Sequence, residues 1–277
     1  MNKVDLHLHT SLSDGLMNPE DVVVLAKQNE CKVIAITDHE LLSNFEQLEK
    51  KYDINIIPGI EFNTSVSNLH LLGYGITDFE KLDRKMTELR KLNEVVCIEV
   101  IEKLRIDGFD VSVEKLKEYL YKIKLDCNIL DKRKLVKYLM HMGYSSSIVD
   151  TYNKLIGKGQ KYYISNIKLN PKEIIELVGL CGGRTVLAHP NTITNDNEEL
   201  QRYISELKDY GLFGIEVINS KMKLNQTEYY QYITKKFNLL ETFGSDFHNP
   251  ASDCMGLEID SKKLEKIYDS LVLKKRL

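Results

Sequence analysis

Residues 5–15 of this chain have the sequence D-L-H-L-H-T-S-L-S-D-G. Successive side chains of a β-strand point to opposite faces, so His7 and His9 share one face and the intervening leucines share the other. Asp14 follows just beyond the strand, on a loop where Gly15 permits an unusual backbone turn. Two imidazoles and a carboxylate at one strand end suit a metal ion, so this stretch predicts a metal site.

Helix and strand patterns alternate after this stretch. Residues 19–29 predict an amphipathic helix with proline at its start, and residues 32–37 predict a buried parallel strand. The same alternation resumes after residue 171. Further strands are predicted at about 55–60, 69–74, 184–188, 213–218 and 239–243. The pattern indicates an α/β protein with a barrel of mostly parallel strands.

Polar residues gather on or at the ends of these strands. The carboxyl ends of parallel barrel strands converge on one face, so side chains far apart in sequence can meet there. The candidates are His7, His9, Asp14, His39, Glu61, His70, His189, Asp246 and His248. Nine such groups in one place require cations, and their number suits two or three divalent ions.

A different pattern occupies residues 79–164. A 3.6-residue apolar period predicts one long helix from about residue 78 to residue 106, and shorter helical patterns follow at about 113–121, 133–142 and 147–156. This segment has 18 Lys+Arg against 13 Asp+Glu, a net charge of +5, whereas the remainder of the chain has −8. We therefore predict a barrel domain, residues 1–78 and 165–277, with a helical insert subdomain, residues 79–164, and the charge asymmetry suggests an anionic substrate.

Composition limits the class and compartment. The chain is 43% hydrophobic and 29% charged, as in ordinary soluble proteins. Its five cysteines are scattered and form no C-x-x-C pair, which favours free thiols in a reducing cytosol. The apolar runs are too short to span a bilayer, and the N-terminus enters a predicted strand without the apolar core of a signal peptide. We expect a cytoplasmic protein with no membrane association and no obligate protein partner.

Six motifs in order resemble the PHP (polymerase and histidinol phosphatase) family of metal-dependent phosphoesterases. They are D-L-H-L-H-T-x-x-S-D-G, T-D-H, P-G-I-E, H-L-L-G-Y, V-L-A-H-P and G-S-D-F-H, between residues 5 and 248. The resemblance implies a distorted (β/α)7 barrel with a trinuclear metal centre.

The resemblance also implies a ligand set. His7, His9, Glu61 and Asp246 would hold the first ion; Glu61 would bridge to a second ion bound by His70 and His189; Asp14, His39 and His248 would hold the third. Asp38 would orient His39 without binding metal itself. We interpret Glu216 as a strand residue fixed by core contacts, with a role in the site as the alternative.

The helical insert resembles that of nucleoside 3′,5′-bisphosphate phosphatases and related 5′→3′ exoribonucleases. Where that subgroup usually has G-R-P-H-I-A, this chain has D-K-R-K-L-V at residues 131–136. Lysine cannot reproduce the bidentate grip of arginine on phosphate, although an anion remains the expected partner. The candidate substrate-binding residues are Lys132, Arg133, Lys134 and Lys158.

The expected activity is metal-dependent hydrolysis of a phosphate monoester of a small nucleotide, such as a nucleoside 3′,5′-bisphosphate, by a metal-bridged hydroxide. Mixed oxygen and imidazole ligation suits Mn²⁺, Fe²⁺ or Zn²⁺. Three alternatives remain: a 5′→3′ exoribonuclease on short RNA, a histidinol-phosphate phosphatase, and a non-catalytic metal-binding PHP module. The expected partners are therefore anionic small-molecule phosphate esters or short RNA.

Overall fold

The computed structural model describes residues 2–219 and 222–272. The chain forms two compact units, which we call the barrel unit, Met1–Asp83 with Leu169–Leu277, and the helical unit, Arg84–Lys168. Each has a hydrophobic core of its own residues. In the part of the chain that the structure describes, every helix is too short or too polar to cross a bilayer.

The barrel unit is built on one sheet, which has eight strands within the described residues. The strands follow the order β7-β6-β5-β4-β3-β2-β1-β8. They are β1 (Asn2–Leu8), β2 (Cys31–Ile36), β3 (Asn55–Asn63), β4 (His70–Tyr74), β5 (Arg184–Leu187), β6 (Gly214–Ile218), β7 (Leu240–Phe243) and β8 (Leu257–Ile259). The sheet nearly closes into a barrel, because Leu8 at the end of β1 bridges to Phe247 just after β7. The predicted α/β class and distorted barrel are confirmed.

Strand direction brings the polar residues to one end of the barrel. The neighbours β1, β2 and β3 are parallel, as are β5, β6 and β7. β4 runs antiparallel to both β3 and β5. Its first residue, His70, therefore lies at the edge where the parallel strands end.

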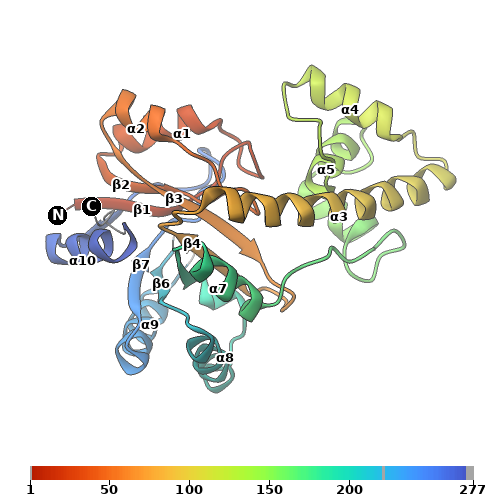
Figure 1. Ribbon diagram of the computed structural model, residues 1–277. Coiled ribbons are helices and arrows are strands. Elements are labelled where there is room, and N and C mark those ends of the chain that lie inside the picture. Colours follow the sequence, from red (N-terminus) through yellow and green to blue (C-terminus); the bar gives the residue numbers. More distant parts are fainter. Residues whose placement is uncertain (1, 220–221, 273–277) are drawn as a thin grey trace. The chain divides into compact units, whose positions relative to one another are not determined.

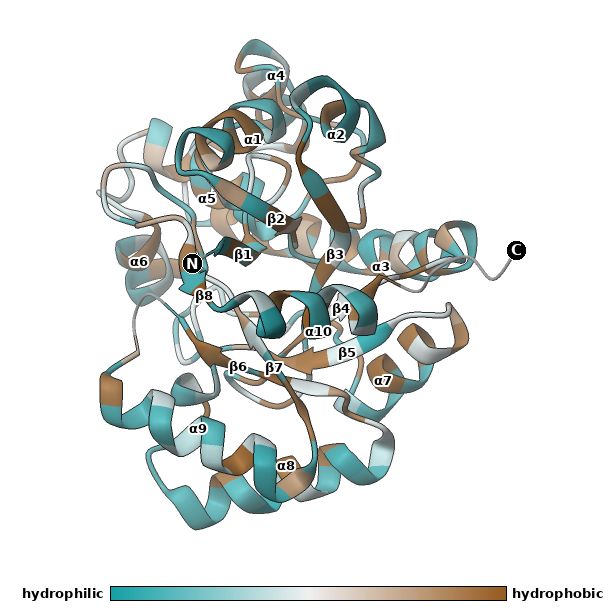
Figure 2. Ribbon diagram, turned by 90° about the vertical axis from the view of Figure 1, so that its left-hand side faces the viewer, coloured by the Kyte–Doolittle hydropathy of each residue, from teal (hydrophilic) through white to brown (hydrophobic). Residues whose placement is uncertain are grey.

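Helices surround the barrel (Figure 1). They are α1 (Pro19–Gln28), α2 (Glu46–Tyr52), α7 (Pro171–Leu180), α8 (Asn197–Tyr210), α9 (Leu224–Phe237) and α10 (Ser261–Leu271), with a short 3₁₀ turn at Pro190–Thr192. Local chemistry defines their starts: Asn18 caps α1 ahead of a proline, and Asn170 forms a capping box with Glu173 in α7. Figure 2 shows the strands largely hydrophobic and the outer faces of α8 and α9 hydrophilic.

The helical unit contains most of α3 (Phe79–Ile106), followed by α4 (Val113–Lys122), α5 (Lys132–His141), α6 (Ile148–Thr151) and a π-helical turn (Tyr152–Ile156). Leucines of α3, α4 and α5 form its core, among them Leu104, Leu116 and Leu135. The unit begins at residue 84 rather than 79, since the first turn of α3 is held to the barrel unit, where Lys81 donates to the Leu180 carbonyl.

Candidate metal centre

Strand β1 places the first two histidines. The alternation along β1 turns Asp5 and His7 to the same face, and His9 follows just past the strand end. The side chains of His7 and His9 are fully buried. The nine predicted ligands come from β1, β3, β4 and the segments after β1, β2, β5 and β7, and the structure brings them together at one end of the barrel.

A first group of donor atoms surrounds the facing nitrogens of His7 and His9. Their Nε2 atoms are 3.1 Å apart. Asp246 Oδ1 lies 3.6 Å from His7 Nε2 and 3.5 Å from His9 Nε2. Glu61 Oε2 lies 3.4 Å from His7 Nε2 and 3.2 Å from His9 Nε2. These four residues are the predicted ligands of the first ion.

A second group uses the other oxygen of Glu61. Glu61 Oε1 lies 3.0 Å from His189 Nε2 and 3.0 Å from His70 Nδ1. The Glu61 side chain is only 1% exposed, whereas that of His70 is 24% exposed. One carboxylate therefore faces both groups, as expected of a bridging ligand.

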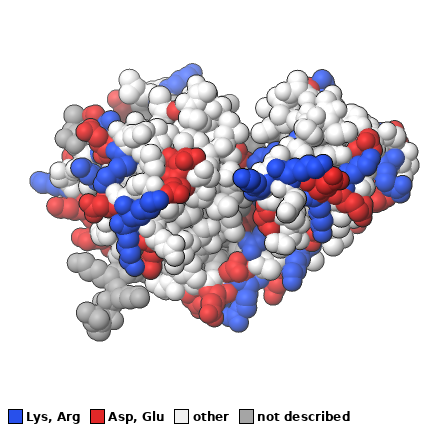
Figure 3. All heavy atoms as spheres, turned by 90° about the horizontal axis from the view of Figure 1, so that it is seen from above, with Lys and Arg blue, Asp and Glu red and all other residues white. Residues whose placement is uncertain are grey.

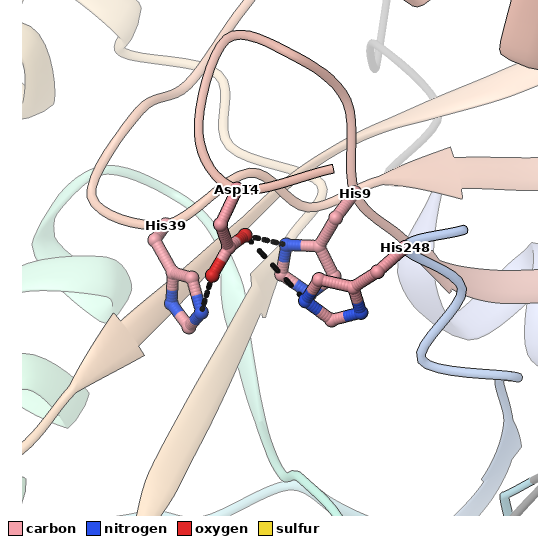
Figure 4. Close-up of side chains that lie close together, drawn as sticks. All are labelled: His9, Asp14, His39 and His248. Atoms are coloured by element: carbon pink, nitrogen blue, oxygen red, sulfur yellow. Dashed lines mark ion pairs between the residues drawn. The ribbon is translucent and has the colours of Figure 1, made fainter. Parts of the chain in front are cut away.

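A third group gathers around Asp14 (Figure 4). Its Oδ1 lies 3.4 Å from His9 Nδ1 and 3.5 Å from His248 Nε2, and its Oδ2 lies 3.4 Å from His39 Nε2. His9 contributes its Nδ1 here and its Nε2 to the first group, so its ring lies between the two.

The donor set fits divalent cations. Ligand atoms that share one ion at about 2.1 Å lie roughly 3.0–3.4 Å apart, close to the spacings in all three groups. His9 Nδ1 is buried and has no hydrogen-bond partner among the described residues, which is costly unless another group satisfies it. Imidazole with carboxylate oxygen suits Zn²⁺, Fe²⁺ or Mn²⁺.

The pKa values of the centre show how strongly its charges interact. Burial would raise the pKa of Glu61, but His39 and His7 hold it well below its usual range. Burial would lower the pKa of His9, but Asp246 and Glu61 raise it to about 10. The carboxylates of Glu61, Asp14 and Asp246 are thus stabilised in the ionised form, and the raised pKa values of His7 and His9 show that these carboxylates attract positive charge, which a bound cation would also supply.

Neighbouring polar residues hold the ligands in place. The Asp38 carboxylate accepts hydrogen bonds from Thr10 N at 2.8 Å, Thr10 Oγ1 at 2.7 Å and Ser13 Oγ at 2.5 Å. These hydrogen bonds hold in place the loop on which Asp14 lies. His39, which we expected Asp38 to orient, has Asn63 Nδ2 3.1 Å from its Nδ1.

Sequence reasoning missed the supporting roles of Asn63 and Asp5, and it left a site role of Glu216 only as the alternative. Asp5 is fully buried and accepts backbone N–H groups of Ser245 at 2.8 Å and Gly256 at 2.9 Å. Burial raises its pKa to about 6 against the effect of these hydrogen bonds. Glu216 is a buried residue of β6, in agreement with the sequence, and it also contacts His7. Period-two spacing from Glu61 could have suggested Asn63, and a glutamate within an apolar strand could have suggested Glu216.

The four candidate substrate-binding residues lie in the helical unit. Lys132 is 8% exposed, and its Nζ donates to the Ile164 carbonyl. Lys134 Nζ donates to the Ile129 carbonyl at 2.6 Å. Lys158 is exposed, and Arg133 is half-buried. Figure 3 shows basic and acidic side chains interspersed over one face of each unit.

The sequence matches the PHP domain family over residues 5–220. The chain is 26% identical over 279 residues to a 5′-3′ exoribonuclease of Haemophilus influenzae, covering 98% of this chain and 97% of that protein. It is 22% identical over 259 residues to a 3′,5′-nucleoside bisphosphate phosphatase of Chromobacterium violaceum, covering 90% and 88%. Its fold matches a protein from Bifidobacterium adolescentis named as a metal-dependent phosphoesterase, with a TM-score of 0.80 and 21% identity, covering 96% and 95%.

Proposed function

This chain belongs to the PHP domain family and is a metal-dependent phosphoric ester hydrolase, and we propose that it removes phosphate from a small nucleotide such as a nucleoside 3′,5′-bisphosphate. One observation carries the proposal: Glu61 lies within 3.4 Å of His7 and within 3.0 Å of His189, between two groups of metal-type donors. The similarity to the bisphosphate phosphatase of Chromobacterium violaceum, which covers 90% of this chain, supports this choice of substrate.

We propose that nine side chains hold two to three ions of Mn²⁺, Fe²⁺ or Zn²⁺. The first ion would be held by His7, His9, Glu61 and Asp246, the second by Glu61, His70 and His189, and the third by Asp14, His39 and His248. Bound divalent ions supply an activated water at neutral pH and positive charge for the phosphoryl oxygens.

The residues of the chain contribute positioning. Glu61 directs one oxygen to each of two groups and stays ionised because histidines face it. Asp38 holds the loop on which Asp14 lies, which keeps that carboxylate facing His39. Since His7 and His9 are fully buried, their nitrogens are shielded from water and interact strongly with nearby charges.

Of the four candidate substrate-binding residues, Arg133 and Lys158 remain proposed contacts with the anionic part of the substrate, whereas the ammonium groups of Lys132 and Lys134 donate to backbone carbonyls within the helical unit. The excess of basic residues in the helical unit supports this assignment. We expect Lys158→Ala, which removes an exposed ammonium, to raise KM several-fold with little change in kcat. An unchanged KM would count against this residue.

A second candidate function is 5′→3′ exoribonuclease activity on short RNA. The similarity to the exoribonuclease of Haemophilus influenzae, which extends over 97% of that protein, favours it. A net positive charge in the helical unit also suits a nucleic-acid backbone.

The test compares substrates at equal concentration after reconstitution with Mn²⁺. Adenosine 3′,5′-bisphosphate, AMP, histidinol phosphate and a 5′-phosphorylated RNA 5-mer are assayed for inorganic phosphate and for released mononucleotides. His9→Ala serves as the control, and we expect it to lose at least about 100-fold in rate, since His9 faces two donor groups.

The products separate the candidates. Phosphate from the bisphosphate supports the phosphatase, and mononucleotides from the 5-mer support the exoribonuclease. Turnover of histidinol phosphate alone would replace both with a histidinol-phosphate phosphatase. Bound metal without turnover of any of these esters would favour a non-catalytic metal-binding module.

A further inference from the structure

Glu216 contacts two candidate metal ligands from different parts of the chain. It lies on β6, and its side chain is 1% exposed. Its Oε1 is 2.9 Å from His7 Nδ1, and its Oε2 accepts the backbone N–H of His189 at 2.8 Å. One buried carboxylate therefore joins a residue of β1 to the residue that follows β5.

The contact with His7 determines which of its ring nitrogens is available. A carboxylate can only accept a hydrogen bond, so His7 Nδ1 must carry a proton and donate it to Glu216. In the neutral ring the lone pair is then on Nε2. That nitrogen faces His9 Nε2 at 3.1 Å and Glu61 Oε2 at 3.4 Å, in the first donor group.

The contact with His189 holds an unusual backbone conformation. His189 has φ 24° and ψ 63°, a left-handed conformation that few residues other than glycine adopt. Its N–H is fixed by Glu216 Oε2, and its Nδ1 lies 3.0 Å from Thr192 Oγ1. Its Nε2 is thereby aimed at Glu61 Oε1, 3.0 Å away.

Close packing leaves little freedom to this arrangement. Gly244 follows β7 and lies against both His7 and Glu216. A Cβ atom there would lie 2.3 Å from His7 Cβ and 2.6 Å from Glu216 Oε1. The space between Gly244 and the His7–Glu216 pair therefore has no room for a side chain larger than the hydrogen atom of glycine.

We propose that Glu216 is a positioning residue that fixes His7 in the Nδ1–H tautomer and holds the His189 backbone. The first donor group, which contains His7, and the second, which contains His189, are thereby positioned by the same carboxylate. This inference rests on the proposed metal centre. It assigns no metal contact to Glu216 itself.

Glu216→Gln tests the tautomer directly. The backbone N–H of His189 can only donate, so the glutamine oxygen would turn toward it and the NH₂ group would turn toward His7. His7 Nδ1 would then have to accept, and Nε2 would carry the proton. The substitution keeps the size of the side chain but is expected to block the metal-facing nitrogen.

The experiment uses metal-free full-length protein titrated with Zn²⁺ against a chromophoric chelator. We expect Glu216→Gln to weaken the tightest site about 10- to 100-fold. In Zn²⁺-loaded protein with ¹⁵N-labelled histidine, the His7 Nδ1–H signal of the wild type should be lost in the variant. That signal is assigned by its absence in His7→Gln.

Glu241→Gln is the matched control. Glu241 lies on the neighbouring strand β7, where its Oε2 pairs with Lys263 Nζ at 2.8 Å. We expect wild-type Zn²⁺ affinity and an unchanged His7 signal in this variant. If Glu216→Gln does not fold, Glu216→Asp replaces it, because a carboxylate drawn back by one methylene cannot span the same two partners, and the same loss of affinity is expected.

Three outcomes would overturn parts of this picture. Wild-type affinity with an intact His7 Nδ1–H signal in Glu216→Gln would overturn the positioning role. Wild-type protein that binds no Zn²⁺ would overturn the metal centre and this inference with it. Wild-type protein that binds Zn²⁺ but hydrolyses no phosphate ester would overturn only the proposed function, since the titration requires no substrate.

Discussion

Gly244 is a residue at which a single methyl group should disturb the whole centre. We expect Gly244→Ala to lower the free energy of unfolding by about 1–3 kcal/mol, because the new Cβ would lie 2.3 Å from His7 Cβ. Urea unfolding of the metal-free protein measures this change. Gly179→Ala in α7 is the matched control, since among the described residues no atom outside its own helical turn lies within 4 Å of a Cβ there, and it should be neutral or stabilise by up to about 1 kcal/mol. Equal stability of the two variants would contradict the packing argument.

At the residue scale, strand-end position made the nine proposed ligands predictable. His39 follows β2 and His189 follows β5, so local pattern and parallel strand direction were enough to place them together. Glu216 could not be assigned in this way. Its partner His7 lies 209 residues away, and no local pattern encodes a pairing across the barrel.

At the element scale, the position of the segment after β1 depends on the Asp38 carboxylate, which accepts hydrogen bonds from it. We expect Asp38→Asn to lower the metal affinity of the proposed third site about 10- to 100-fold. The amide cannot accept all the hydrogen bonds that Thr10 and Ser13 donate to the Asp38 carboxylate. Metal content at limiting Mn²⁺, measured by atomic emission, should fall by one ion per chain. Unchanged content would show that the loop holds its position without Asp38.

Element type was easier to predict than element direction or detail. The alternation in residues 69–74 predicted a strand, and the short connection from β3 explains why β4 is antiparallel, since a parallel pair needs a crossover of about a dozen residues or more. Apolar periodicity predicted a helix to residue 156, but not its π-helical last turn. There Gly157 N donates to Tyr152 O at 2.8 Å, a bond that depends on backbone winding rather than on side-chain pattern.

At the scale of the whole molecule, metal should stabilise the barrel unit. A ligand at 100 times its Kd adds about 2.7 kcal/mol, so Mn²⁺ should raise the Tm of the transition that unfolds this unit, and a chelator should reverse the rise. The gain should shrink as pH falls from 7.5 to 5.5, because protons compete with the ion for imidazole nitrogens. Calorimetry at both pH values measures this. A Tm independent of Mn²⁺ at pH 7.5 would contradict it.

The division into two units could be predicted only in outline. The change from strand alternation to a 3.6-residue period indicated a helical insert, because the two periods bury different faces. The boundary could not be fixed, since α3 continues without interruption from one unit into the other. Burial of Leu82 and Met86, on either side of residue 84, follows the same apolar stripe.

The nine proposed ligands extend from His7 to His248, and this spread has a consequence for biosynthesis. Ribosomes add about 5–20 residues each second, so roughly 10–50 s separate the synthesis of the first ligand from that of the last. Throughout this interval the nascent chain holds an incomplete donor set. The second donor group is complete once His189 has been added, whereas the first and third wait for Asp246 and His248. A message truncated before codon 246 would therefore yield a protein that lacks ligands from two of its three donor groups.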